Sequence, residues 1–278
     1  MPDSAQKRAI KIVTANYGVA KRPLPRPIHA MTFRILLLLS GLMATLSTAA
    51  QSEEATVAVA TNFLSTARDI SAAFKNETGH EVILVHGSTG KLYAQIVAGA
   101  PYDVFLSADA DRPARLASGG FLVEGSPKPY AVGRLALVYH DASMTGSIQD
   151  ILSRQDLRVA VADPAVAPYG RAARSVIETV RGSDWRDGIV LGDSVAQAFA
   201  FVATGNADVG LVALSLAIEH ADRIAFHEVP ATFHETIRQD AALMIRREIS
   251  GAAQAFYEFL DLPTVVEIMT EAGYGVPP

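Results

Sequence analysis

The sequence predicts an α/β fold built as two lobes with a ligand cleft between them. Short apolar runs alternate with segments of helical spacing, the pattern of a mostly parallel sheet covered by helices. The alternation occurs in two series of roughly a hundred residues each, and a loop rich in Gly and Pro separates them. In such folds a ligand binds at the carboxyl ends of the strands, so we expect the cleft there.

The first series alternates predicted strands with predicted helices. Its strands are predicted at 56–60, 81–85 and 104–107, and its helices at 62–77, 92–97 and 113–117. Gly79 is expected to end the first helix and Gly119-Gly120 the third, because glycine adopts the backbone conformation that follows a helix.

The second series begins with a strongly apolar strand at 135–139 and repeats the pattern. Further strands are predicted at 158–162, 189–191, 209–212 and 241–245, with helices at 171–181, 196–204, 252–260 and 264–272. The last two helices are expected to return to the first lobe. We therefore assign residues 51–134 and 242–278 to the first lobe and residues 135–241 to the second.

The first fifty residues have the pattern of an export signal. Arg34 precedes a run of about twelve mostly apolar residues, and the small residues Ser47 to Ala50 follow it. The run is shorter than the ~20 residues that span a bilayer, so a cleaved signal is favoured over a membrane anchor or a buried helix. We assign residues 31–50 to a signal peptide and expect the mature chain to begin near Gln51. Residues 1–30 form either a non-native upstream segment or an extended N-terminal region, and Met31 is the expected start.

The charge and cysteine content exclude several classes of function. The chain has no cysteine, which excludes a disulfide, a thiolate metal site and a cysteine nucleophile. Residues 1–50 carry seven Lys and Arg and one acid, which leaves 17 basic and 28 acidic residues and a net charge near −11 beyond them. Such an acidic body is not expected to bind nucleic acid, and an anion would need local donors.

Four polar segments follow predicted strands and open predicted helices. They are Thr61-Asn62, the run from Gly87 to Gly90 that contains Ser88 and Thr89, Pro168-Tyr169-Gly170, and Ser194-Val195. A helix start presents free backbone N–H groups and a partial positive charge, and hydroxyl and amide side chains add donors. Four such corners in one cleft would hold a tetrahedral dianion without a lysine or arginine. The alternative for each corner alone is an ordinary helix cap.

No enzyme motif accompanies these corners. The histidines are scattered without metal-ligand spacing, and neither a Gly-x-Ser-x-Gly elbow nor a complete phosphate-binding loop is present. Asp109 and Asp111 form a carboxylate pair, for which a helix cap is the expected role. The chain is therefore predicted not to be an enzyme. An enzyme that uses Asp109 or Asp163 is the remote alternative.

The corner segments resemble the periplasmic molybdate-binding proteins, the solute-binding components of ABC transporters. The similarity runs from about residue 56 to residue 275. It rests on Ala60–Leu64, Gly87–Gly90, Gly99–Asp109, Ala167–Gly170, Ser194–Ala198, Gly205–Ala213 and the final Gly-Tyr-Gly, in the family's order. The run Gly-Ala-Pro-x-Asp-Val-Phe-x-Ser-Ala-Asp is the most specific of these.

The resemblance implies a type II periplasmic-binding-protein fold, two α/β lobes with a ligand cleft between them. It implies a periplasmic solute-binding protein that binds molybdate and also tungstate, needs no cofactor, acts as a monomer and delivers its ligand to an inner-membrane ABC permease. Molybdenum would be bound only as the oxyanion. The ligand-binding residues carried over from the family are Thr61, Asn62, Ser88, Thr89, Tyr169 and the backbone N–H of Val195.

One position departs from the family. Many members have a ligand tyrosine after the strand that here ends in Leu211-Val212-Ala213, and this chain has Ala213 instead. Tyr169 is expected to supply an aromatic hydroxyl in its place. The alternatives that remain are a binding protein for another oxyanion or organic anion, such as sulfate or phosphonate, and a ligand-sensing domain of a regulator. The export signal and the missing DNA-binding segment count against the second.

Overall fold

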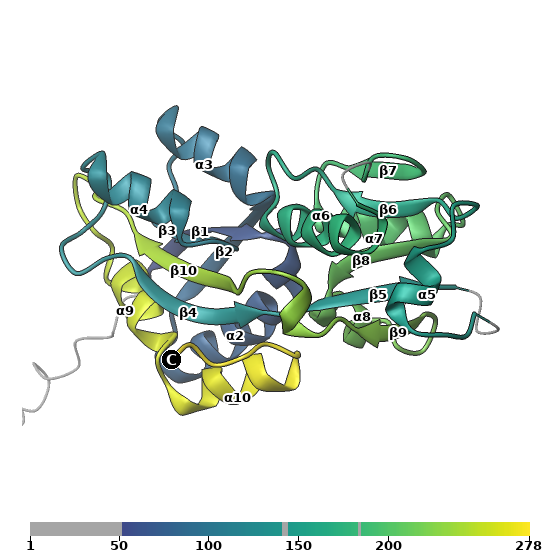
Figure 1. Ribbon diagram of the computed structural model, residues 1–278. Coiled ribbons are helices and arrows are strands. Elements are labelled where there is room, and N and C mark those ends of the chain that lie inside the picture. Colours follow the sequence, from purple (N-terminus) through teal and green to yellow (C-terminus); the bar gives the residue numbers. More distant parts are fainter. Residues whose placement is uncertain (1–51, 141–143, 183–184) are drawn as a thin grey trace, which may run out of the picture. The chain divides into compact units, whose positions relative to one another are not determined.

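The structure, a computed structural model, describes residues 52–140, 144–182 and 185–278. Its described part contains two mixed five-stranded sheets flanked by helices, which form the two lobes (Figure 1). The predicted α/β fold with two lobes is thus confirmed. The segments assigned to residues 1–30 and to the signal peptide at 31–50 lie outside the described residues.

The first sheet has the strand order β2-β1-β3-β10-β4. Its strands are β1 (Glu54–Ala60), β2 (Glu81–Gly87), β3 (Val104–Leu106), β4 (Lys128–Gly133) and β10 (Ile237–Leu243). The strands β1, β2 and β3 are parallel, whereas β10 runs antiparallel to both β3 and β4. The three parallel strands therefore end at one edge of the sheet.

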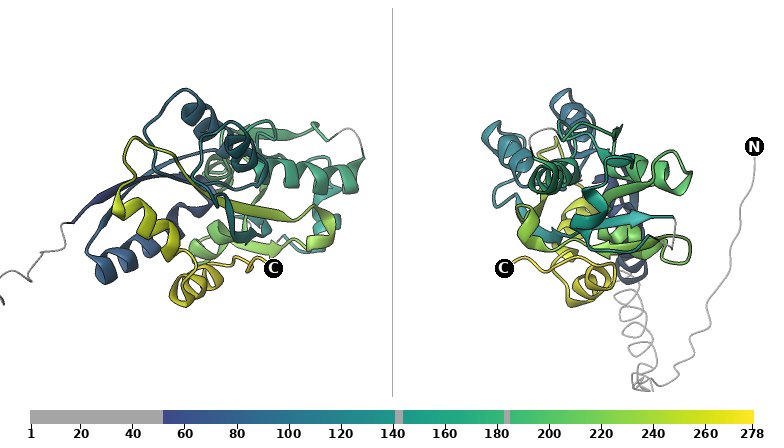
Figure 2. Two further views of the ribbon diagram at one scale, coloured as in Figure 1. Left: turned by 90° about the vertical axis from the view of Figure 1, so that its left-hand side faces the viewer. Right: turned by 45° about the vertical axis from the view of Figure 1, so that its right-hand side comes forward.

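Helices cover this sheet and connect its parallel strands. They are the short 3-10 helix η1 (Thr61–Phe63), α2 (Leu64–Thr78), α3 (Thr89–Val97) and α4 (Asp111–Ser118), joined by α9 (Gly251–Phe259) and α10 (Pro263–Glu271). Helix α2 ends where predicted, because Gly79 adopts a left-handed conformation with φ of 76°. Helix α9 packs on β1 and β10, and α10 packs beside α2 (Figure 2).

The second sheet repeats this arrangement with the order β7-β6-β8-β5-β9. Its strands are β5 (Leu135–Tyr139), β6 (Val159–Ala162), β7 (Ile189–Gly192), β8 (Val209–Ala213) and β9 (Ala225–Glu228). Its helices are α5 (Ile148–Leu152), α6 (Pro168–Arg181), α7 (Val195–Ala203) and α8 (Leu214–Glu219), and η2 (Ala231–Phe233) follows β9. Strands β6, β7 and β8 are parallel, and β5 runs antiparallel to β8 and β9.

The chain passes between the sheets twice. Strand β4 leads through Arg134 directly into β5, and the segment after β9 returns the chain to β10 (Figure 1). The return occurs earlier than expected. The sequence placed a strand at 241–245 and the end of the second lobe at 241, whereas β10 begins at Ile237 and pairs with the first sheet along its length. The difference arises because Arg238, Gln239 and Asp240 interrupt the apolar pattern although they belong to the strand.

Candidate functional site

The first two predicted corners lie next to each other at the carboxyl edge of the first sheet. Strands β1 and β2 pair in parallel, with Ala60 opposite Gly87, so the residues that follow each strand emerge side by side. Thr61 and Asn62 form the start of η1, and Ser88 and Thr89 form the start of α3. All four side chains are buried. Polar side chains buried at helix starts indicate a site that is closed to solvent rather than a set of surface caps.

The other two corners occupy the equivalent edge of the second sheet. Strands β6 and β7 pair in parallel with Ala162 opposite Gly192, and the segments after them lead to Tyr169 near the start of α6 and to Val195 at the start of α7. Both residues are buried. The second lobe therefore presents two helix starts in the same way as the first.

Contacts between the lobes bring the four corners together. The backbone N–H of Gly90 in α3 donates to the carbonyl of Val166, just before α6, at 2.9 Å. Gln239 contacts both Asn62 and Tyr169, with hydrogen bonds of 2.9 and 3.4 Å. Helix α7 lies against η1. These contacts bring the four segments that contain the predicted site residues next to one another between the lobes.

The hydroxyl groups of Ser88 and Thr89 differ in their surroundings. The Ser88 side chain is 4 % exposed, and its Oγ has no hydrogen-bond partner among the described residues. The Thr89 Oγ1 accepts a hydrogen bond from the backbone N–H of Ala108 at 3.2 Å. A buried hydroxyl without a partner is unfavourable by itself, so Ser88 is the residue of this pair that is suited to a ligand.

The side chain of Asn62 is held by the protein. Its Nδ2 donates to Gln239 Oε1 at 2.9 Å and to the Tyr274 hydroxyl at 3.3 Å. The backbone carbonyl of Asn62 accepts from Tyr274 at 2.5 Å and from Ser215 at 3.0 Å. These contacts fix η1, whose backbone N–H groups have no partner within so short a helix.

The chain is similar in sequence and in structure to known solute-binding proteins. A family model described as bacterial extracellular solute-binding protein matches residues 55–275. The chain belongs to this family. The molybdate-binding protein ModA of Rhodobacter capsulatus is 40% identical over 81% of this chain and 89% of its own length, and that of Azotobacter vinelandii is 39% identical over 88% and 100%. The solved structure of the Azotobacter vinelandii periplasmic molybdate-binding protein aligns with a TM-score of 0.76 and 36% identity, covering 81% of this chain and 100% of that one.

These similarities confirm the predicted resemblance to the periplasmic molybdate-binding proteins and the two-lobed binding-protein fold. Both relatives are molybdate-binding proteins, and the matched family model describes extracellular solute-binding proteins. Within the described ranges, no helix of this solute-binding protein is both long and apolar enough to cross a membrane, and no cluster of three His, Asp or Glu residues could hold a metal ion.

The basic residues nearest the corners of this solute-binding protein pair with carboxylates. Lys91 Nζ lies 2.7 Å from Asp193 Oδ2, and Arg171 Nη2 lies 3.1 Å from Asp109 Oδ2, each pair joining the two lobes. Arg112 also contacts Asp109 and reaches the carbonyl of Ala165 in the second lobe at 3.3 Å. The corners themselves therefore offer uncharged donors, and the ion pairs hold the lobes together beside them.

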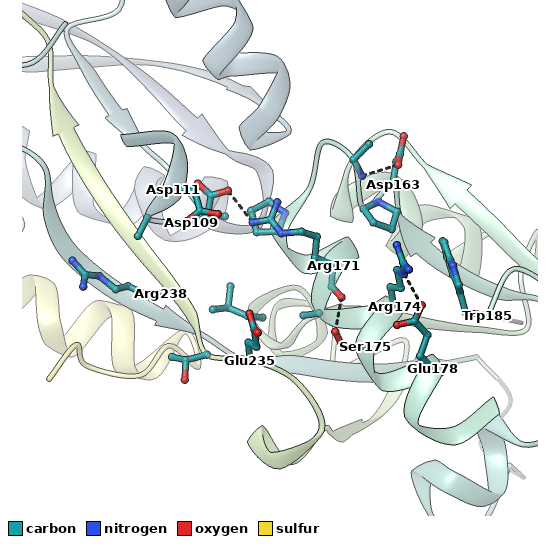
Figure 3. A pocket seen from close by; sticks show the side chains of 18 of the residues that line it. Asp109, Asp111, Asp163, Arg171, Arg174, Ser175, Glu178, Trp185, Glu235 and Arg238 are labelled. Carbon is teal, nitrogen blue, oxygen red and sulfur yellow. Dashed lines mark hydrogen bonds and ion pairs between the residues drawn. The ribbon is translucent and has the colours of Figure 1, made fainter. Parts of the chain in front are cut away.

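An open pocket of about 630 Å³ lies between the lobes next to these ion pairs (Figure 3). Arg171 reaches across from α6 to Asp109, while Arg174 pairs with Glu178 near Trp185. Arginine and acidic side chains alternate along its walls, so it carries no strong charge of either sign. Of the corner residues, Pro168 lines this pocket, whereas none of the six predicted ligand-binding residues does.

Tyr169 keeps its proton at neutral pH. Burial raises the pKa of its hydroxyl well above the usual value, and the nearby Tyr274 adds to the shift. The hydroxyl is thus available as a hydrogen-bond donor throughout the range in which a cell operates.

Three residues of the site were missed by the sequence analysis. Gln239 is fully buried in β10, and Tyr274 and Ser215 meet at the carbonyl of Asn62. The signal for Gln239 was the adjacent polar pair Gln239-Asp240 within β10. Tyr274 belongs to the Gly-Tyr-Gly segment noted in the sequence. Ala213, at which the resemblance led us to expect a ligand tyrosine, is the N-cap residue of α8, and Ser215 follows it by two residues.

Proposed function

We propose that this solute-binding protein captures molybdate, and also tungstate, between its two lobes and delivers it to the permease of an ABC transporter. The observation that carries the proposal is the buried Ser88 hydroxyl, which has no hydrogen-bond partner in the part of the chain that the structure describes and lies at one of four neighbouring helix starts. The molybdate-binding relatives, similar over nearly their whole length, supply the identity of the oxyanion.

The proposed ligand-binding residues are Thr61, Asn62, Ser88, Thr89, Tyr169 and Val195. Ser88 would donate through its hydroxyl and Tyr169 through its phenol. Val195, as the first residue of α7, would donate through its backbone N–H. Because the Asn62 amide is engaged by Gln239 and Tyr274, Asn62 would contribute its backbone N–H instead.

This donor set favours a fully deprotonated, doubly charged oxyanion. Helix starts and hydroxyl groups stabilise negative charge without a cation, as at other anion sites. A protonated anion such as hydrogen phosphate needs an acceptor for its own proton, and the corner N–H groups cannot supply one. Molybdenum would be bound only as the oxyanion, through the same residues, and no cofactor would be required.

Titration calorimetry with molybdate, tungstate, sulfate and hydrogen phosphate tests the proposal. Molybdate and tungstate are expected to bind with one ligand per chain, and hydrogen phosphate is expected not to bind. Ser118→Ala is the matched control for Ser88→Ala, because Ser118 is an exposed serine whose hydroxyl donates to a carbonyl of its own helix. Absence of molybdate binding would refute the assignment. Equal affinity for sulfate would refute it as well and would favour a binding protein for another oxyanion.

We further propose that the protein acts as a monomer in the periplasm after removal of residues 1–50. The extracellular family and the periplasmic relative support this location. The permease partner follows from the transport role of the relatives. Copurification of the mature chain with an inner-membrane permease, in the presence of molybdate, would test the partnership.

A further inference from the structure

A continuous chain of hydrogen bonds runs behind the proposed ligand site, from the backbone carbonyl of Asn62 to the hydroxyl of Tyr169. Its direction can be deduced from groups that have a single role. A carbonyl oxygen only accepts, and an amide nitrogen only donates. A tyrosine hydroxyl has one proton, so once it donates that proton to one neighbour it can only accept from the others. The role of each group along the chain of hydrogen bonds therefore follows from the role of its neighbour.

The Tyr274 hydroxyl is the first link. It donates to the Asn62 carbonyl at 2.5 Å, or to Ser215 at 2.9 Å when Ser215 in turn donates to that carbonyl. In either arrangement its only proton is used. Its oxygen must therefore accept from the Asn62 side chain, 3.3 Å away, which requires the amide nitrogen of Asn62 to face it.

Gln239 is the second link. The same Asn62 nitrogen lies 2.9 Å from one terminal atom of Gln239, which must therefore be its oxygen. The hydroxyl of Tyr130 also lies 3.2 Å from that oxygen, and its one proton is shared between this oxygen and the Ser107 carbonyl, likewise 3.2 Å away. The orientation of the Gln239 amide is thus fixed by its neighbours, and its nitrogen points the other way.

Tyr169 is the last link. The Gln239 nitrogen lies 3.4 Å from the Tyr169 hydroxyl, so the hydroxyl oxygen accepts there. The Asn62 side chain also lies near this hydroxyl and, like Gln239, acts on it as a donor, so the described residues show no acceptor for the Tyr169 proton. Gly133 closes the space around both groups, since a Cβ at this position would lie 2.3 Å from the Tyr169 hydroxyl and 2.9 Å from Gln239 Nε2.

We propose that Gln239 is a positioning residue for anion binding: by donating to the Tyr169 oxygen, it directs the Tyr169 proton toward the oxyanion. Gln239 does not touch the ligand in this arrangement. The inference rests on the proposed function, since it assumes that an oxyanion occupies the site beside Tyr169. Through Gln239, strand β10 of the first lobe would thus orient the Tyr169 donor of the second lobe.

A double-mutant cycle between positions 239 and 169 tests the inference by titration calorimetry with molybdate. Tyr169→Phe removes the donor and should weaken binding about tenfold to a hundredfold, as for a hydrogen bond to a charged group. Gln239→Met should weaken binding of the unaltered chain by a similar factor. In the Tyr169→Phe background it should change affinity by less than about threefold, because the proton it directs is gone.

Gln239→Glu provides a second variant if Gln239→Met fails to fold, as judged by thermal unfolding. A carboxylate keeps the oxygen that accepts from Asn62 and Tyr130 but replaces the donor with an acceptor, so Tyr169 would donate to Glu. The added charge affects both backgrounds and cancels in the cycle. Gln149→Met is the matched control, because Gln149 is exposed on α5.

The outcomes separate the inference from the proposed function. Equal losses from the Gln239 variants in both backgrounds would show a merely structural role and overturn the inference, as would unchanged binding by Tyr169→Phe. If the unaltered chain binds no molybdate, the proposed function fails and the inference fails with it. Losses at position 239 that disappear when Tyr169 is replaced would support it.

Discussion

Removal of the Ser88 hydroxyl should affect stability and binding in opposite directions. Its Oγ is buried and has no hydrogen-bond partner within residues 52–140, 144–182 and 185–278, and a buried unsatisfied polar group costs about 1 to 3 kcal/mol. Ser88→Ala relieves this cost in the ligand-free protein, so the free energy of unfolding should stay the same or rise. Binding should lose about 1.5 to 3 kcal/mol, the contribution of a hydrogen bond to a charged group, which corresponds to roughly a tenfold to hundredfold higher Kd.

The neighbouring residue gives the contrasting result. Thr89→Val keeps the shape of the side chain but removes the oxygen that accepts from the Ala108 N–H. The unfolding free energy should therefore fall by about 1 to 3 kcal/mol, because that N–H is left buried and unpaired. Urea denaturation measures the stability of both variants, and calorimetry with molybdate measures their affinity. Unchanged affinity of Ser88→Ala, or a loss of stability equal to that of Thr89→Val, would refute the reasoning.

Three further predictions concern pH, lobe contact and processing. Burial raises the pKa of Tyr169 and Tyr274 above the unfolded value of about 10, so the stability they contribute is complete below about pH 10 and is lost above it, where the unfolded chain ionises first. The thermal midpoint should fall above about pH 10, and less in Tyr274→Phe; an equal fall would contradict this. Asp109→Asn should lower the unfolding free energy in urea by about 3 kcal/mol, because its carboxylate is buried in an ion pair, whereas Arg171→Gln should lower it by less than about 1 kcal/mol, since that side chain is 43% exposed. Mass spectrometry of the exported chain should find an N-terminus near Gln51, and one before residue 31 would exclude the assigned start.

The sequence was sufficient to locate the four helix starts that form the proposed site. Each corner follows an apolar strand and opens a helix, and the carboxyl ends of neighbouring parallel strands meet at one edge of a sheet. Thr61, Ser88, Tyr169 and Val195 could therefore be found from local pattern and resemblance. Their roles could not be distinguished, since the partner of Thr89 is a backbone group nineteen residues away.

The residues behind the corners could not be found in this way. Gln239 is separated from Asn62 by 177 residues, and Tyr274 by 212. Contacts at such separations depend on how the sheets are assembled, which no local pattern specifies. Strand β4 was also missed, because it contains Pro129 and ends at Gly133, two residue types that are disfavoured in strands.

The Tyr274 contact also constrains when the site can form in a nascent chain. The Tyr274 hydroxyl supports η1, and the next residue, Gly275, pairs with Val132 in β4, just before the first crossing of the chain. Until residue 275 has emerged, η1 lacks this support and the Asn62 amide lacks one of its acceptors. Under the proposed function, the complete site therefore forms only after residues 274 and 275 have been made, and a chain that stops before them would lack the support of η1.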